Sequence, residues 1–236
     1  MFLGRLLDIM IHMLHGAAGS TADWDEFGPL LQANGLRPVD LYANKVSGFD
    51  SFAMSLNAAA AEGDVLIGYS MGGRLALHAL LDEGSKWSKV VIISAHTGII
   101  DASEREDRLL SDGLWAQLVT DNWDKFVEKW SSQPVFGERK IPWCRSDRVA
   151  PGDKVQRCFT CWSLGRQRNL LPELAFITIP VLWISGEDDN KFSSIAKVAT
   201  SMIPHAELAI ISGSGHRCPW EQPELTAGVI RGFLSP

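Results

Sequence analysis

The stretch DVLIGYSMGGRLALHAL (64–80) constrains the fold more strongly than any other part of this 236-residue chain. A continuous apolar run meets a helical pattern without a linker, and Ser70 stands at the junction. Gly68 and Gly72 flank this serine at a spacing that lets a strand and a helix approach closely around a sharp turn. Such a turn places the serine hydroxyl above the end of a sheet, beside a helix N-terminus. A plain glycine-rich turn without chemistry is the alternative.

Short apolar runs recur along the chain, and helical patterns separate most of them. Several runs are continuous rather than alternating, which is typical of parallel strands buried on both faces. We therefore predict a mostly parallel, doubly wound α/β sheet. The predicted strands are residues 8–14, 36–42, 64–70, 89–95, 180–186 and 206–212, and the clearest helices are 51–63 and 71–84, the second ending in a C-cap at Gly84.

The strand pattern is interrupted between residues 97 and 177, where we expect helices only. Five of the nine tryptophans lie in this segment, as in a small subdomain with its own core. We predict that residues 97–177 form a helical cap and that residues 1–96 and 178–236 form the core. The pair Cys158–Cys161 lacks a second cysteine pair, so we expect it to pack in the cap and predict no metal site.

Composition and charge argue against several classes of function. The net charge of −6 disfavours nucleic acid as a partner, and no apolar run reaches the roughly 18 residues of a membrane span. Four cysteines do not make a disulfide scaffold, which favours the cytoplasm. The sequence does not specify an oligomeric state. Between Arg139 and Arg168, eight basic residues against two acidic ones indicate a solvated basic face or an anion-binding surface.

A serine nucleophile needs a base, and the base needs an acid that orients it. When a serine follows this kind of strand-to-helix turn, the acid and the histidine follow it in the chain in that order. His216 comes after the strand at 206–212 and is the predicted base. Asp188 and Asp189 both follow the strand at 180–186, so the spacing alone leaves the acid open between them.

Groups around the serine suggest an oxyanion hole and an anion clamp. The backbone N–H groups of Met71, which begins the helix, and of Ala17, in the turn HGAAG, are the predicted oxyanion donors. Arg74 lies in the first helical turn, where the macrodipole disfavours a cation by ~0.3–1 kcal/mol. It either pairs with a surface acid or binds an anion beside the serine. We expect Tyr69 to line the site, and His96 is a further pocket candidate.

Seven motifs together resemble a known family over nearly the whole chain. They are LHGAAGSTADW, GYSMGGRLAL, SAHTGI, the pattern ER–R–SD–WA from Glu104 to Ala116, KWSSQPVF, SGEDDNKF and GSGHRCPWEQP. With these motifs the chain resembles the α/β-hydrolase superfamily. Within it, the chain is most similar to the 2-succinyl-6-hydroxy-2,4-cyclohexadiene-1-carboxylate synthases of menaquinone and phylloquinone biosynthesis.

The resemblance implies an elimination in which Ser70 acts as a base on a carbon acid and no cofactor takes part. The substrate would be 2-succinyl-5-enolpyruvyl-6-hydroxy-3-cyclohexene-1-carboxylate, which loses pyruvate. The resemblance also selects Asp189 as the acid. Because this substrate carries three carboxylates, guanidinium groups are suitable partners. The implied substrate-binding residues are Arg74, Arg108, Trp130 and Arg148, with Arg145 as the alternative to Arg148.

Two other functions fit the same sequence. A carboxylic-ester or thioester hydrolase would use the same triad without needing the cationic residues. A non-catalytic binding protein would keep the scaffold, which a fold alone does not exclude. Loss of activity in Ser70→Ala argues against the second alternative, and the effect of removing Arg74 or Arg108 separates an anionic substrate from a neutral ester.

Overall fold

The computed structural model describes residues 9–43, 48–137 and 152–235 of the chain. In these residues six strands form one sheet, in the order β2-β1-β3-β4-β5-β6, and all neighbouring pairs are parallel. The predicted parallel sheet is confirmed, and each strand is shorter than its apolar run. The strands are β1 (Ile11–Leu14), β2 (Leu36–Val39), β3 (Val65–Tyr69), β4 (Lys89–Ile93), β5 (Val181–Gly186) and β6 (Ala206–Ile211).

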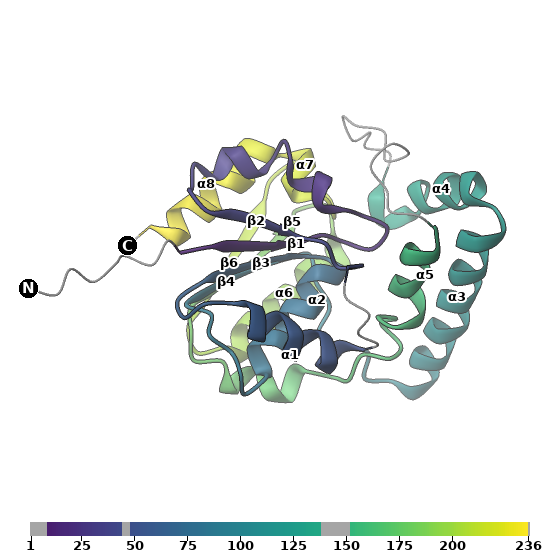
Figure 1. Ribbon diagram of the computed structural model, residues 1–236, viewed down its shortest axis with the longest axis horizontal. Coiled ribbons are helices and arrows are strands. Elements are labelled where there is room, and N and C mark those ends of the chain that lie inside the picture. Colours follow the sequence, from purple (N-terminus) through teal and green to yellow (C-terminus); the bar gives the residue numbers. More distant parts are fainter. Residues whose placement is uncertain (1–8, 44–47, 138–151, 236) are drawn as a thin grey trace, which may run out of the picture.

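Helices cover both faces of the sheet, as Figure 1 shows. Because successive strand residues point to opposite faces, each face has its own core. Leu66 of β3 packs on one face and its neighbour Ile67 on the other. On the first face lie α1 (Phe49–Ala59), α2 (Met71–Leu81) and α6 (Asn190–Met202), and on the second lie η1 (Thr21–Trp24), η2 (Gly28–Leu31), α7 (Cys218–Glu221) and α8 (Pro223–Leu234).

Helix α2 is the central helix of the first face. Every residue from Met71 to Ala79 is buried, Arg74 and His78 included, because α1 and the strands β1, β3 and β4 pack around the helix. The predicted C-cap at Gly84 is wrong. The helix ends at Leu81, and Asp82 follows in an extended conformation. The Asp82 carboxylate accepts the Gly84 N–H at 3.1 Å, so a side chain rather than a left-handed glycine closes the turn.

Between β4 and β5 the described residues contain helices and no strand. α3 (Ala102–Asp121), α4 (Trp123–Ser131), η3 (Pro134–Phe136) and α5 (Gly152–Thr160) form a group beside one end of the sheet, at the right of Figure 1, and we call this group the cap. Its rings form an aromatic cluster. The Trp130 ring centroid lies 5.3 Å from that of Trp115, 5.8 Å from Phe126 and 5.2 Å from Phe159.

The chain returns from the cap along the first face of the sheet. Trp162 and Leu170 are completely buried in the same core as α2, and η5 (Leu171–Phe176) packs against α2 and α6. Cys158 is buried where the cap meets this core, with its thiol 3.2 Å from the Tyr42 hydroxyl. Of the helices that the structure describes, none combines the length and the hydropathy of a bilayer span.

Candidate active site

The turn between β3 and α2 holds Ser70 in a backbone conformation that few residues adopt. Its φ of 51° is positive, which is uncommon for a residue other than glycine. A side chain on Gly68 would place its Cβ 2.6 Å from the Gly72 carbonyl oxygen. A Cβ on Gly72 would come to 2.6 Å from the His15 carbonyl oxygen and closer still to that of Leu14. The glycines are therefore required by the close approach of α2 to β1 and β3.

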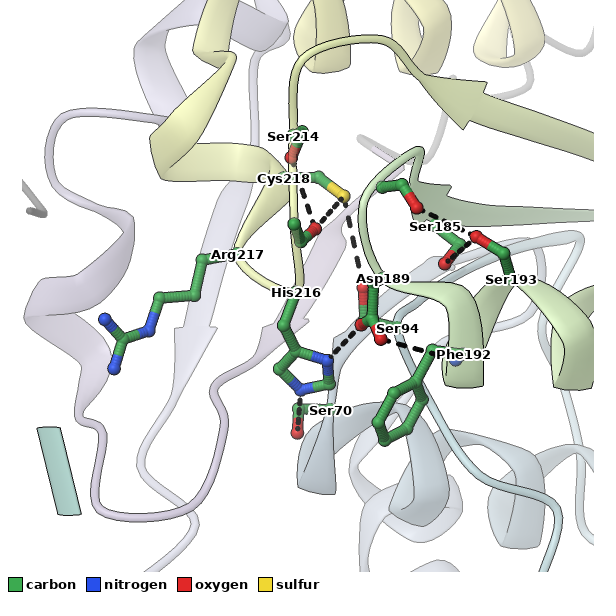
Figure 2. Close-up of polar contacts among 12 residues, drawn as sticks. Ser70, Ser94, Ser185, Asp189, Phe192, Ser193, Ser214, His216, Arg217 and Cys218 are labelled. Atoms are coloured by element: carbon green, nitrogen blue, oxygen red, sulfur yellow. Dashed lines mark hydrogen bonds and ion pairs between the residues drawn. The ribbon is translucent and has the colours of Figure 1, made fainter. Parts of the chain in front are cut away.

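Three side chains from three strand ends meet in one hydrogen-bonded row. Figure 2 shows the His216 imidazole between Ser70 and Asp189. The His216 Nδ1 lies 2.7 Å from Asp189 Oδ2, and its Nε2 lies 3.1 Å from Ser70 Oγ. Because the carboxylate can only accept when ionised, Nδ1 donates, and Nε2 is left to accept the serine proton. The row is therefore arranged for His216 to act as a base toward Ser70.

The structure separates the two candidate acids. Asp189 contacts His216, and its other oxygen accepts the Phe192 N–H at 3.4 Å as the N-cap of α6. The backbone N–H of Asp188 donates to the Ser214 carbonyl at 2.9 Å. The helix cap thus fixes the carboxylate of Asp189 beside the imidazole.

Glu221 supports the loop that carries His216, a role that sequence analysis did not find. Its carboxylate accepts the Gly215 N–H at 2.6 Å and the Arg217 N–H at 3.1 Å, on either side of the histidine. Two charge-assisted bonds to neighbouring amides limit the movement of the loop between them. No sequence pattern predicts this contact, because it depends on how α7 packs against the loop that carries His216.

A cavity of about 240 Å³ lies above this row of residues. Ser70 and His216 line it, and so do both predicted oxyanion donors, Ala17 and Met71. Met71 is the first residue of α2, where a backbone N–H has no acceptor within its own helix. Negative charge that develops beside Ser70 therefore meets a donor at this helix end.

Trp130 lines the cavity and Tyr69 does not. The indole Nε1 of Trp130 is buried and has no hydrogen-bond partner among the residues that the structure describes. The Tyr69 side chain points to the opposite face of β3 and packs edge-on against Trp220, with centroids 4.6 Å apart. Its ring centroid lies 5.7 Å from that of His216, so Tyr69 supports the histidine rather than facing the cavity.

Arg74 is buried, with 8% of its surface exposed, and it lines the cavity. Its guanidinium donates to the Trp162 carbonyl at 2.9 Å and to Gln167 Oε1 at 3.3 Å. It also lies over the Phe49 ring, 5.3 Å from the centroid. Among the residues that the structure describes, no carboxylate forms an ion pair with it. Burial, followed by the nearby Arg108, lowers the pKa of Arg74 to about 9, so the side chain is still charged at pH 7.

Arg108 reaches the same cavity from the cap. Its Nε donates to Asp112 Oδ1 at 2.9 Å, one turn later on α3. Asp112 is buried, so this pair orients the guanidinium while leaving its remaining N–H groups available. Sequence analysis missed a third cation at the cavity, Lys191, in the first turn of α6.

Part of the predicted anion-binding set lies outside the described residues. Arg148 and its alternative Arg145 fall between residues 138 and 151. Of the eight basic residues counted between Arg139 and Arg168, four are described, and none of these lines the cavity. The described part of the chain also contains no cluster of His, Cys, Asp and Glu that could hold a metal ion.

Comparison with known proteins finds relatives over nearly the whole chain. Residues 13–229 match the model of the alpha/beta hydrolase family. The chain is 30% identical to a 2-succinyl-6-hydroxy-2,4-cyclohexadiene-1-carboxylate synthase from Escherichia coli O1:K1 / APEC, over 92% of this chain and 89% of that one. It is 29% identical to the synthase of the same name from Serratia proteamaculans (strain 568), over 94% and 91%.

Among solved structures, MenH from S. aureus is similar with a TM-score of 0.89 and 25% identity, over 96% of this chain and 93% of that one. The resemblance stated from the sequence motifs is thereby confirmed at the level of fold and family. The roles of individual site residues rest on the geometry above.

Proposed function

We propose that this chain, which belongs to the alpha/beta hydrolase family, is a carbon–oxygen lyase that forms 2-succinyl-6-hydroxy-2,4-cyclohexadiene-1-carboxylate. It would do so by eliminating pyruvate from 2-succinyl-5-enolpyruvyl-6-hydroxy-3-cyclohexene-1-carboxylate, in the menaquinone or phylloquinone pathway. One observation supports this most strongly. The cavity beside Ser70 is lined by three cations and, among the described residues, by no carboxylate. The positive charge of this cavity favours binding of a small polycarboxylate, whereas it would contribute little to binding a neutral ester.

The proposed reaction is a proton abstraction followed by loss of a leaving group. His216 takes the Ser70 hydroxyl proton at Nε2, and Ser70 Oγ removes the proton at C2 of the substrate ring. That proton is acidic because C2 is next to the succinyl carbonyl. The electron pair forms the C2–C3 double bond, the ring double bond moves to C4–C5, and the C5–O bond breaks. The leaving enolate becomes pyruvate on protonation. The reaction involves no net oxidation or reduction, so as proposed it requires no redox cofactor.

Charge builds up on the succinyl carbonyl oxygen during proton abstraction. The N–H groups of Met71 and Ala17 are the proposed donors to this oxygen. Arg74 and Arg108 would bind carboxylates of the substrate, since each has guanidinium N–H groups at the cavity. The unpartnered indole N–H of Trp130 is a further donor to the substrate. Tyr69 acts in this proposal only through its packing on His216.

We propose that the reaction takes place in the cytoplasm, with which the three unpaired cysteines in the described ranges are consistent. The substrate is a small molecule, and the proposal involves neither nucleic acid nor a membrane.

The test is a paired assay on purified protein. One arm generates the enolpyruvyl cyclohexene substrate in situ with the preceding pathway enzyme and follows pyruvate release together with the absorbance of the conjugated diene. The other arm supplies a short activated ester. We expect fast elimination and feeble ester hydrolysis, with both abolished in Ser70→Ala.

Good ester turnover without pyruvate above the spontaneous background would replace the synthase with an ester hydrolase that uses the same triad. If wild-type protein and Ser70→Ala were both inactive in the two arms, a non-catalytic binding role would be favoured. In either case the fold and the hydrogen-bonded row at Ser70 would stand.

A further inference from the structure

Two basic side chains at the cavity take no part in the row at Ser70 or in the arginine contacts. His96 follows β4, and Lys191 lies in the first turn of α6. The Phe192 ring packs between the imidazole rings of His96 and His216. Its centroid is 6.4 Å from the His96 ring and 4.4 Å from the His216 ring, and Figure 2 shows it beside Ser70 and His216. His96 therefore lies beside α6, the helix that also carries Lys191 to the cavity.

The hydrogen bonds of the His96 loop fix which imidazole nitrogen carries the proton. The backbone N–H of Gly98 donates to His96 Nδ1 at 3.0 Å, so Nδ1 must be the acceptor. In a neutral imidazole the proton is then on Nε2. Nε2 has no partner among the described residues, and the side chain lines the cavity. His96 thus offers one N–H donor to whatever occupies the cavity.

The surroundings keep this imidazole neutral and strongly attract an anion. Burial lowers the pKa of His96 to about 4, and the positive charges of Lys191, Arg74 and Arg108 lower it in that order. Gln167 also joins two of these groups, because its Oε1 accepts from Arg74 while its Nε2 donates to the His96 carbonyl at 3.2 Å. The His96 loop and the Arg74 guanidinium are therefore held in one network.

Lys191 is a cation without a counter-charge in the described part of the chain. No described carboxylate lies within ion-pair distance of its ammonium group, although Asp189 is only two residues away. The carboxylate of Asp189 is occupied by His216 and by the N-cap of α6. An ammonium group at the rim of a cavity that already holds two guanidinium groups is left free to bind an anion.

We propose that His96 Nε2–H and the Lys191 ammonium form a third carboxylate-binding position in this cavity, beside those of Arg74 and Arg108. The inference deepens the proposed function, on which it rests for the substrate class. A substrate with three carboxylates then meets three positions within the described residues. Because the imidazole is neutral, it adds a directed hydrogen-bond donor to this position without adding to the repulsion among the cations.

The test measures binding of two ligands that differ by one carboxylate. Tricarballylate is glutarate with a third carboxylate on its central carbon, and calorimetric titration gives a Kd for each. We expect wild-type protein to bind tricarballylate at least tenfold more tightly than glutarate. We expect this preference to fall to within about twofold in Lys191→Met and in His96→Asn, since a hydrogen bond to a charged group accounts for a factor of roughly ten or more.

The variants are chosen so that folding does not decide the result. An asparagine at position 96 can still accept the Gly98 N–H through its own side chain, as in an Asx turn. Lys197→Met removes an exposed lysine from the same helix, and His205→Asn removes an exposed histidine far from the cavity wall. Both controls should keep the wild-type preference, and all four variants should unfold within a few degrees of wild type.

Unchanged ligand preference in both Lys191→Met and His96→Asn would overturn the inference, and so would a wild-type protein that does not bind tricarballylate. Equal loss of preference in the two controls would also overturn it. Failure of the proposed function looks different. Tricarballylate would still bind through Lys191 and His96, but no pyruvate would be released. With the synthase substrate, both variants should raise KM by at least tenfold and change kcat much less.

Discussion

Replacing Arg74 by methionine should separate substrate binding from stability, because the structure places this cation where it serves no ion pair in the described fold. Burial lowers the pKa of Arg74 to about 9, which corresponds to on the order of 5 kcal/mol against the charged form, at about 1.36 kcal/mol per pKa unit. The folded pKa lies below the unfolded one, so this cost is fully present at every pH below about 9. At pH 7 the protein therefore bears the whole cost.

Methionine would remove the buried charge and keep much of the apolar contact with the Phe49 ring. It would also remove two hydrogen bonds, to Trp162 and Gln167, which contribute about 1.5–3 kcal/mol each when the donor is charged. The two effects nearly cancel, so we expect the free energy of unfolding of Arg74→Met to lie within about 1.5 kcal/mol of wild type. Urea denaturation at pH 7 measures this difference.

The effect on the reaction should be far larger. A guanidinium that binds a carboxylate through two charge-assisted bonds contributes at least about 3 kcal/mol, which is a factor of roughly 150 in kcat/KM for pyruvate release. Hydrolysis of a neutral ester by the same variant should change less than threefold, and Arg37→Met, at an exposed position on β2, should change neither activity. If Arg74→Met lost more than about 3 kcal/mol of stability, and both activities fell together, Arg74 would be a structural residue and our reasoning would be refuted.

Three further predictions follow from the same structure. Gly72→Ala should cost more than about 3 kcal/mol of stability, since its Cβ would collide with backbone oxygens that cannot move away; a soluble variant with wild-type Tm would contradict this. Glu221→Gln should lower kcat about tenfold with little change in KM, because the loop carrying His216 loses its charged acceptor; an equal loss in a Glu224→Gln control would argue against it. Burial lowers the pKa of His78 to about 4, so stability should fall by up to about 3 kcal/mol as the pH drops from 6.5 to 4. The unfolded histidine takes up the proton first in that range. In His78→Asn the slope of unfolding free energy against pH should flatten, and an unchanged slope would show that other groups cause it.

The sheet was predictable because its strands are buried on both faces. β3 and β4 contain almost only apolar residues, and such runs have no other stable place in a chain of this size. Their ends were less predictable. The runs extend into residues that have left the ladder for a turn, such as Ser70 and Ser94, both with positive φ. Strand ends depend on pairing with neighbours that the local sequence does not reveal.

The positions of Ser70 and His216 were predictable because their chemistry and chain order are both restrictive. The acid was not, since spacing left it open between Asp188 and Asp189 and only the family resemblance selected Asp189. Side-chain direction was harder to predict from proximity in sequence. Tyr69 is adjacent to Ser70, yet alternation along β3 turns it to the other face, against Trp220. Lys191 and Glu221 could not be found from sequence, because a lysine in a first helical turn and a glutamate in a short helix are ordinary surface residues. Only in the folded structure does α6 bring Lys191 to the cavity and α7 bring Glu221 to the amides beside His216.

The three cations at the cavity also determine how a substrate reaches it. The protein as a whole carries a charge of −6, so a trianion approaching from a distance is repelled rather than attracted. At physiological ionic strength charges more than about 8 Å apart are largely screened from each other, so a ligand at the cavity meets mainly the local field of Arg74, Arg108 and Lys191. Long-range electrostatics therefore adds little to the association rate of the ligand, and the local attraction mainly lowers its dissociation rate. In the proposed reaction the same attraction would hold the dianionic product, so we expect added salt to accelerate product release from this site.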